Sequence, residues 1–238
     1  MWDSFWQSLG KAFNIIGSGS PLINEVIATT MKMTFTSSII SFIIGAPLGL
    51  LLATYNFKGK KVLVIIVRTL MGLPPVAIGI LIYLLFRGIG PFGDLNLIFT
   101  VKAMIIAQVV LLIPLVVGMV ETGAEATGHA LYETRKGLGF GPGKTFLLMA
   151  NENKYSLVAS YMFAFARATA EVGAVQIVGG NILHRTMVMT TYIALNYNSG
   201  NLEYAVALGV IIIAITLGLN LVAGILQFAG SRKKKRWN

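Results

Sequence analysis

The chain has 238 residues, of which 55% are hydrophobic and only 12% are charged, whereas soluble domains carry about 25% charged residues. This composition excludes an ordinary water-soluble domain. The net charge of +10 does not indicate nucleic-acid binding, because the cations gather at the ends of apolar runs and in the tail at 232–236. There is no cysteine, which excludes disulfides, thiolate metal sites and cysteine nucleophiles.

The first 17 residues predict an amphipathic helix. Trp2, Phe5, Phe13 and other apolar residues recur at helical spacing with polar residues between them. We expect residues 1–20 to form an interfacial helix; the alternative is an irregular leader. The segment lacks a basic region followed by an apolar core and a small-residue cleavage site, so we expect no removable signal peptide.

Several apolar stretches are long enough to cross a bilayer, which takes about 20 residues as a helix. They lie approximately at 33–54, 62–86, 97–120, 155–178 and 205–229. The sequence therefore predicts an all-α transmembrane domain of five spans over residues 21–230, followed by a basic tail at 231–238.

The positive charges predict the orientation of these spans. Clusters of Lys and Arg follow the first, third and fifth spans, whereas the opposite segments carry few cations. Because cytoplasmic loops are enriched in Lys and Arg, we expect the N-terminus outside and the C-terminus in the cytoplasm. The outer loop between the fourth and fifth spans also holds an apolar stretch at 187–195. This stretch is too short to cross the membrane, and we expect it to dip into the protein.

Glycine and proline interrupt two of the spans. The sequence Gly45-Ala-Pro-Leu-Gly49 favours close packing of small residues over a broken helix. Pro74 and Pro75 remove backbone donors and disfavour helix before them, so the second span is predicted to be kinked or unwound near Leu73. Such a break could serve as a gate or be a static kink.

Arg167 lies near the middle of the fourth span, where a charge costs about 2.5 to 3.5 kcal/mol. Glu171 follows four residues later, so an intrahelical ion pair is possible. The guanidinium offers planar donors suited to an oxyanion, or the pair serves only to hold helices together. Arg87 and Lys102, at the outer span ends, could draw in an anion or extend to lipid headgroups, as we expect for Arg68 and Lys32.

The polar segment 121–154 combines turn formers with charges of both signs. Its centre reads Glu133-Thr-Arg-Lys-Gly-Leu-Gly139, and we expect a short helix stopped by a left-handed turn at Gly139. The sequence Gly139-Phe-Gly-Pro-Gly-Lys-Thr145 is not a phosphate-binding loop, because Leu138 stands where that motif needs its first glycine. No catalytic constellation is present, and His129 and His184 are predicted on opposite sides of the membrane, so we expect no metal site.

Three segments resemble ABC importer permeases. Glu133 to Gly139 is similar to their cytoplasmic docking loop, with departures at Thr134, Arg135, Asn151 and Glu152. Phe165-Ala-Arg-Ala-Thr-Ala-Glu-Val-Gly-Ala174 with Gly180-Asn-Ile182, and Met71-Gly-Leu-Pro-Pro-Val-Ala-Ile-Gly79, resemble spans of permeases for molybdate, tungstate and sulfate. The sequence Arg185-Thr-Met-Val-Met-Thr-Thr191 resembles the tungstate branch.

The resemblance implies a type I importer fold, similar to molybdate permeases, in a homodimer with the pathway between subunits. It also implies a separate ABC ATPase in two copies that binds ATP–Mg, an extracytoplasmic oxyanion-binding protein, a prokaryotic plasma membrane, and no cofactor or catalytic residue on this chain. The expected function is ATP-driven tungstate import by alternating access, with molybdate or sulfate as alternative substrates. A secondary transporter is a further alternative, but the inverted repeats expected of one are not found.

Particular residues are expected to carry these roles. Pro74, Pro75, Arg167 and Glu171 are expected on the translocation pathway or its gate, and Arg87 and Lys102 at an outer anion-steering site. The ATPase-docking residues are expected to be Ala130, Leu131, Glu133, Thr134, Arg135, Gly137, Gly139 and Phe140.

Overall fold

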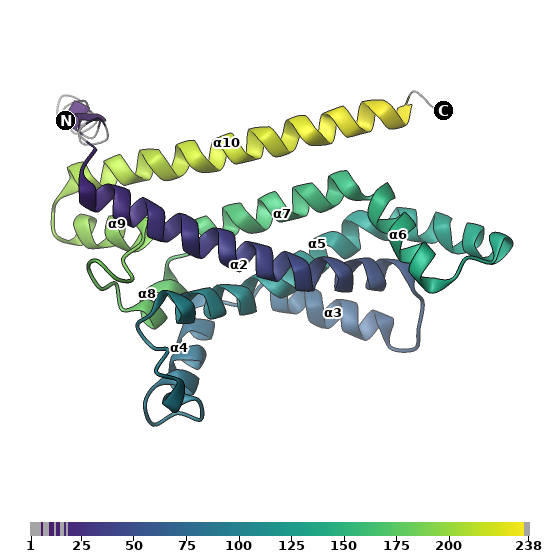
Figure 1. Ribbon diagram of the computed structural model, residues 1–238, viewed down its shortest axis with the longest axis horizontal. Coiled ribbons are helices and arrows are strands. Elements are labelled where there is room, and N and C mark those ends of the chain that lie inside the picture. Colours follow the sequence, from purple (N-terminus) through teal and green to yellow (C-terminus); the bar gives the residue numbers. More distant parts are fainter. Residues whose placement is uncertain (1–5, 7–9, 12, 15–16, 18, 236–238) are drawn as a thin grey trace. The chain divides into compact units, whose positions relative to one another are not determined.

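The computed structural model describes residues 6, 10, 11, 13, 14, 17 and 19–235, and the side chains of these except 129, 130, 132–136, 138, 223 and 226–235. All regular structure in this part of the chain is helical (Figure 1), which confirms the all-α prediction. The longest helices are α2 (Pro21–Thr54), α5 (Val101–Leu138) and α10 (Leu202–Lys235). The shorter elements are α3 (Lys60–Met71), α4 (Pro75–Phe86), η1 (Gly93–Leu95), α6 (Pro142–Glu152), α7 (Lys154–Thr169), α8 (Gly173–Gly179) and α9 (Met189–Asn198).

The five predicted spans are not all continuous helices. Among the described residues, α2, Val101–Gly128 of α5 and Leu202–Val222 of α10 are each long and apolar enough to cross a membrane. The pair α3 and α4 makes a fourth if it counts as one broken span. The expected span at 155–178 is divided into α7 and α8, with residues 170–172 between them. The apolar stretch is present, but the helix is not continuous.

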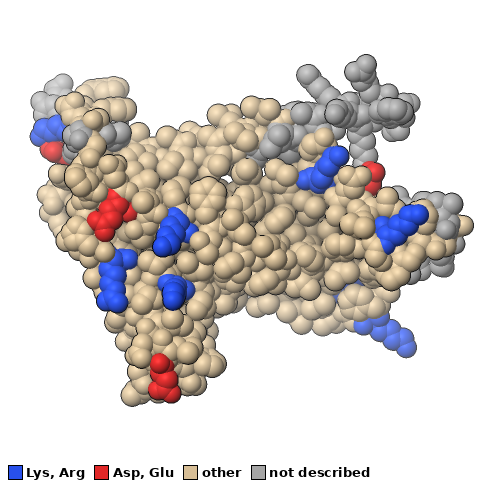
Figure 2. Space-filling model, in the orientation of Figure 1, with Lys and Arg blue, Asp and Glu red and all other residues tan. Residues whose placement is uncertain are grey.

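The chain divides into two compact units. The first unit consists of residues 1–37, 74–108 and 167–218, and the second unit of residues 38–73, 109–166 and 219–238. Helices α2, α5, α7 and α10 contribute residues to both. Large apolar side chains such as Ile43, Leu221 and Ile225 are exposed, and most of the surface visible in Figure 2 carries no charged residue. Since water would disfavour so much exposed apolar surface, this exterior fits a lipid environment.

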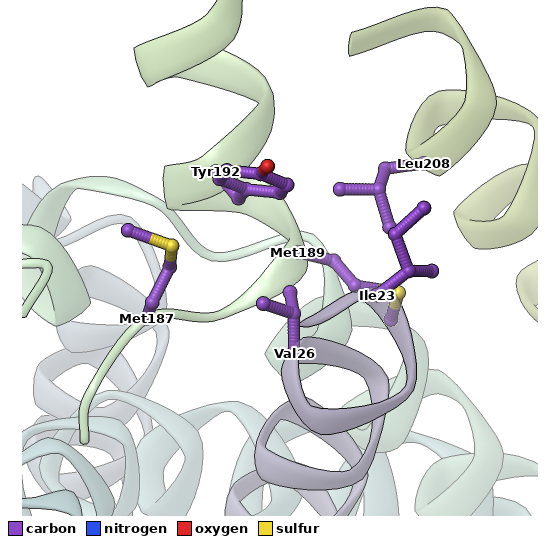
Figure 3. Packing of buried hydrophobic residues seen from close by; sticks show 6 residues of the cluster. All are labelled: Ile23, Val26, Met187, Met189, Tyr192 and Leu208. Atoms are coloured by element: carbon purple, nitrogen blue, oxygen red, sulfur yellow. The ribbon is translucent and has the colours of Figure 1, made fainter. Parts of the chain in front are cut away.

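The core of the first unit contains the short apolar stretch at 187–195. Figure 3 shows Met187, Met189 and Tyr192 packed with Ile23 and Val26 of α2 and with Leu208 of α10. The backbone N–H of Met189 donates to the Thr30 hydroxyl at 2.8 Å, so its polar group stays bonded within the core. The prediction that this stretch dips into the protein is confirmed.

The second unit contains a close helix contact made possible by glycine. A Cβ atom at Gly45 would lie 2.9 Å from the Cβ of Val116, and one at Gly49 would lie 2.7 Å from the carbonyl oxygen of Val117. Any side chain at these two positions would therefore push α5 away from α2. Helix α2 continues through Pro47, so the predicted small-residue packing is confirmed.

The predicted interfacial helix and basic tail fall largely outside the described residues. In the first segment, the described Lys11 pairs with Glu203 of α10, with 2.6 Å between Nζ and Oε1. At the other end, α10 continues into the predicted tail as far as Lys235.

Candidate functional site

The break in the second predicted span lies where the two prolines indicated it. Helix α3 ends at Met71 and α4 begins at Pro75. The N–H groups of Gly72 and Leu73 bond to carbonyls three residues back, at 3.1 and 3.2 Å, which tightens the end of α3. Pro74 is extended, as expected for a residue followed by proline. The predicted unwinding near Leu73 is confirmed.

A second break, which the sequence did not lead us to expect, separates α7 from α8. Helix α7 ends at Thr169, and α8 begins at Gly173. Glu171 accepts a hydrogen bond at Oε1 from the N–H of Ala174, 3.2 Å away, so its carboxylate satisfies a free donor at the start of α8. An acidic residue two positions before a glycine was the signal available for this helix start.

The Glu171 carboxylate also pairs with Arg167. Arg167 Nη1 donates to Glu171 Oε2 at 2.7 Å, and the two side chains are 41% and 5% exposed, respectively. The pairing of these residues is therefore observed, although the pair does not lie within one helix. Glu171 lies beyond the end of α7, so the pair joins a helix end to the break that follows it.

Polar side chains from other helices satisfy the backbone around this break. Buried Gln108 of α5 donates to the carbonyl of Ala168 at 2.9 Å and accepts from the Ser37 hydroxyl at 2.6 Å. Thr190 of α9 donates to the carbonyl of Glu171 at 2.9 Å. These bonds replace those lost where the helix stops, as an apolar environment requires. Sequence reasoning missed both residues, although a glutamine inside an apolar span is itself a signal.

Helices α4 and α8, which follow the two breaks, pack side by side in the first unit (Figure 1). A Cβ at Gly79 would lie 2.8 Å from the Cα of Ala174, and one at Gly173 would lie 2.6 Å from Cγ2 of Val76. The start of α4 at Pro75 thus lies against the start of α8 at Gly173. Residues that the sequence analysis assigned to one pathway are brought to neighbouring positions in space.

The two outer cations differ in their local setting. Arg87 ends α4, where its N–H bonds to the Tyr83 carbonyl at 2.8 Å, and its Nε is buried without a hydrogen-bond partner. Lys102 is exposed in the first turn of α5. No ion pair joins either cation to a carboxylate within the described residues. Their role in anion steering stays a prediction.

The predicted docking segment is more helical than expected. Instead of a separate short helix, α5 continues unbroken to Leu138. Gly139 then adopts φ +63°, which confirms the predicted left-handed turn, and α6 begins at Pro142. The last turns of α5 include Ala130, Leu131, Glu133, Thr134, Arg135 and Gly137, and Phe140 follows the turn. The side chains of Ala130, Glu133, Thr134 and Arg135 lie outside the described part.

Contacts within the second unit hold this helical segment in place. The Thr127 hydroxyl donates to Asn153 Oδ1 at 3.1 Å, and the Tyr55 hydroxyl donates to the Pro142 carbonyl at 3.3 Å. A side chain at Gly128 would collide with the carbonyl of Ala53. Beside the turn, Lys144 Nζ lies 4.2 Å from the centre of the Phe140 ring. Helices α5 and α6 are thereby fixed on either side of the Gly139 turn.

The position of Arg68 differs from the one expected from the sequence. Instead of only extending to headgroups, it pairs with Glu121 of α5, with 3.2 Å between Nη2 and Oε2. The side chain of Glu121 is 4% exposed and that of Arg68 is 54% exposed. The second unit therefore contains its own pair of a buried carboxylate and a half-exposed arginine.

The histidines and acidic residues show no metal-binding cluster in the described part of the chain. Nδ1 of His184 lies 2.7 Å from Oε2 of Glu25, a residue in the N-terminal part of α2. His129 has no described side chain.

These features define a multi-pass membrane protein. It has helices long enough to cross a bilayer, two helix breaks, and an ion pair beside those breaks. The chain belongs to the binding-protein-dependent transport system inner membrane components, whose family model matches residues 45–236. It is therefore a permease subunit of an ABC importer, and the resemblance noted in the sequence is confirmed.

Curated relatives cover nearly the whole chain. The tungstate uptake system permease protein TupB of Peptoclostridium acidaminophilum is 33% identical over 93% of this chain and 97% of its own length. TupB of Campylobacter jejuni is 34% identical over 93% and 91%. A probable anion ABC transporter permease of Haloferax volcanii is 32% identical over 82% and 87%.

The fold is also similar to that of a solved transporter. The methionine ABC transporter MetNI, in an inward-facing conformation, gives a TM-score of 0.68 at 20% identity, covering 87% of this chain and 95% of that one. At this identity the likeness concerns the fold alone.

Proposed function

We propose that this chain is the permease subunit of an ATP-driven importer of tungstate. The support comes from the relatives named for tungstate uptake, at 33% and 34% identity. The sulfate transport system permease protein CysT of Escherichia coli is 25% identical over a similar share of the chain. Molybdate and sulfate are the competing substrates, because tetrahedral oxyanions differ little in charge and shape.

The observation that carries the oxyanion assignment is Arg167. It is an arginine beside two broken helices, and its side chain is 41% exposed next to a buried carboxylate. A guanidinium in an apolar segment costs about 2.5 to 3.5 kcal/mol, and its planar donors match an oxyanion. On this proposal Pro74, Pro75, Arg167 and Glu171 form the gate, while Arg87 and Lys102 draw the anion toward it from outside.

The proposed assembly is a homodimer with two copies of a separate ABC ATPase and an extracytoplasmic oxyanion-binding protein. ATP–Mg binds to the ATPase, and this chain supplies no cofactor site. The N-terminus lies outside and the C-terminus in the cytoplasm. Closure of the ATPase dimer pushes on the segment 121–154, and α5 and α7 transmit the motion so that the pathway opens alternately to the two sides.

Reconstitution tests the substrate and the energy source. The chain is copurified with its ATPase and binding protein, placed in liposomes, and assayed for uptake of tungstate, molybdate and sulfate. We expect ATP-dependent uptake with tungstate as the preferred anion. Equal uptake in liposomes without the ATPase would contradict an ABC mechanism, and a preference for molybdate or sulfate would reassign the substrate.

The docking assignment has a separate test. Glu133→Arg reverses the charge near the end of α5, and Gly139→Trp places a large side chain in the left-handed turn. We expect both variants to insert into the membrane normally and to lose the ATPase on copurification. Normal copurification of both would show that the ATPase docks elsewhere.

A further inference from the structure

We infer that Glu171 is an exchangeable counter-ion. Its carboxylate pairs with Arg167 when no substrate is present, and the transported oxyanion takes its place. This inference rests on the proposed function, since it assumes that an oxyanion passes Arg167.

The contacts of the pair allow such an exchange. Glu171 uses Oε2 for Arg167 Nη1 at 2.7 Å and Oε1 for the N–H of Ala174 at 3.2 Å. Arg167 is 41% exposed, and Glu171 is its one ion-pair partner among the described residues. A guanidinium has several N–H donors. An anion that arrives from the exposed side of Arg167 can therefore bind before Arg167 releases the Glu171 carboxylate.

The backbone at the break does not depend on the ion pair. Gln108 bonds to the carbonyl of Ala168, and Thr190 bonds to the carbonyl of Glu171. The N–H of Glu171 also bonds to the Ala168 carbonyl at 3.3 Å. These bonds remain when Arg167 turns away from the carboxylate. The break can keep its shape while the partner of Arg167 changes.

The exchange solves a physical problem of transport. A permanently unpaired arginine in a poorly hydrated site would retain a divalent anion, and conduction requires that binding be weak enough for release. A tethered carboxylate competes with the anion and lowers its affinity. When the pair forms again, the anion is displaced.

The second unit supplies a matched control. Glu121 is also buried and also pairs with a half-exposed arginine, Arg68. Its carboxylate additionally accepts from the Thr122 hydroxyl at 3.3 Å. Glu121 itself lies inside the continuous helix α5, whereas its partner Arg68 stands in the last turn of α3, before the break that follows Met71. Loss of either carboxylate removes a comparable pair, yet of the two glutamates Glu171 alone is itself a residue of the proposed gate.

Direct binding measurements test the inference. The permease–ATPase complex is placed in nanodiscs without the binding protein, and radiolabelled tungstate is titrated by equilibrium dialysis. We expect Glu171→Gln to bind tungstate about tenfold more tightly than the unmodified chain, the size expected for one charged hydrogen bond, and to transport it more slowly. Glu121→Gln should bind as the unmodified chain does. Combining Arg167→Met with Glu171→Gln should remove the gain.

Equal affinity of Glu171→Gln and the unmodified chain would overturn the inference, as would an equal gain in Glu121→Gln. If Glu171→Gln fails to assemble, Glu171→Asp is used. Its shorter carboxylate cannot hold both bonds, so it should also bind more tightly than the unmodified chain, and unchanged affinity would again contradict exchange. Failure of the unmodified complex to import any oxyanion with ATP would instead contradict the proposed function.

Discussion

The two buried glutamates of this chain show how backbone setting changes the meaning of the same pair of side chains. Glu171 and Glu121 are 5% and 4% exposed, and each pairs with a half-exposed arginine. Glu121 lies within a continuous helix, whereas Glu171 lies in a break and also bonds to the N–H of Ala174. Glu171 thus combines a charge with interrupted backbone at its own position, and this combination is typical of ion pathways in membrane transporters.

Removing each arginine is the sharpest test of this difference. We expect Arg167→Met to lower ATP-dependent oxyanion uptake about tenfold or more, since a charged hydrogen bond contributes about 1.5 to 3 kcal/mol. Arg68→Met should lower it about twofold at most, because Arg68 is not a residue of the proposed gate. Uptake is normalised to the amount of chain in the membrane. An equal loss of uptake and expression in Arg167→Met would indicate a structural role.

The contact between α4 and α8 should be intolerant of added volume. In Gly79→Ala the new Cβ would meet backbone atoms of Ala174 at 2.8 Å, and overpacking costs about 1 to 3 kcal/mol. In Gly72→Ala, at the end of α3, the Cβ would lie 3.5 Å from the Thr69 carbonyl oxygen, an ordinary contact. We expect a lower midpoint of thermal unfolding in detergent for Gly79→Ala and little change for Gly72→Ala. Equal midpoints would mean that α4 and α8 are less tightly packed.

The turn after α5 offers a comparison within the docking segment. Gly139 has φ +63°, where a residue with a side chain costs about 1 to 2 kcal/mol. Gly137 lies within α5, and a methyl group added there would have no other atom within 4 Å, so alanine at this position should favour the helix. We expect Gly139→Ala to weaken ATPase copurification several-fold and Gly137→Ala, which leaves the turn intact, to weaken it less. The reverse order would show that the turn does not position the docking surface.

The smallest effect is expected at the ion pair of Lys11 and Glu203. Their side chains are 60% and 42% exposed, and exposed pairs contribute about 0.2 to 1 kcal/mol at most. Lys11→Ala should therefore change uptake and the unfolding midpoint by amounts close to the error of measurement. A large loss would show that this contact contributes more than its exposure implies.

Much of the fold follows from local sequence signals. The apolar stretches predicted helices, Pro74–Pro75 predicted an unwound segment, and Gly139 predicted a left-handed turn. Each of these features is observed, because each depends on hydropathy or on backbone chemistry within a few residues. The break between α7 and α8 was not predicted. Its stability depends on Gln108 and Thr190, which lie far away in the sequence, so no local pattern could reveal that the lost helix bonds are replaced.

The candidate site was predictable in its charges and not in its arrangement. A charged pair four residues apart suggested Arg167 and Glu171, since that spacing brings side chains together on a helix. The pairing of Arg68 with Glu121 joins residues 53 positions apart and was missed. Pairs of this kind depend on which helices pack together.

The sequence by itself determined that the chain is a membrane-embedded helical protein and which family it resembles, because hydropathy, positive charge and short motifs are properties of the chain alone. Only the tertiary structure decided that α4 and α8 pack together at their N-terminal ends. It also decided that the Glu171 carboxylate accepts hydrogen bonds from both Arg167 and the N–H of Ala174. The reason is that a broken helix in an apolar environment must find its missing hydrogen bonds in other segments. The partners at such a break are fixed by packing between distant parts of the chain.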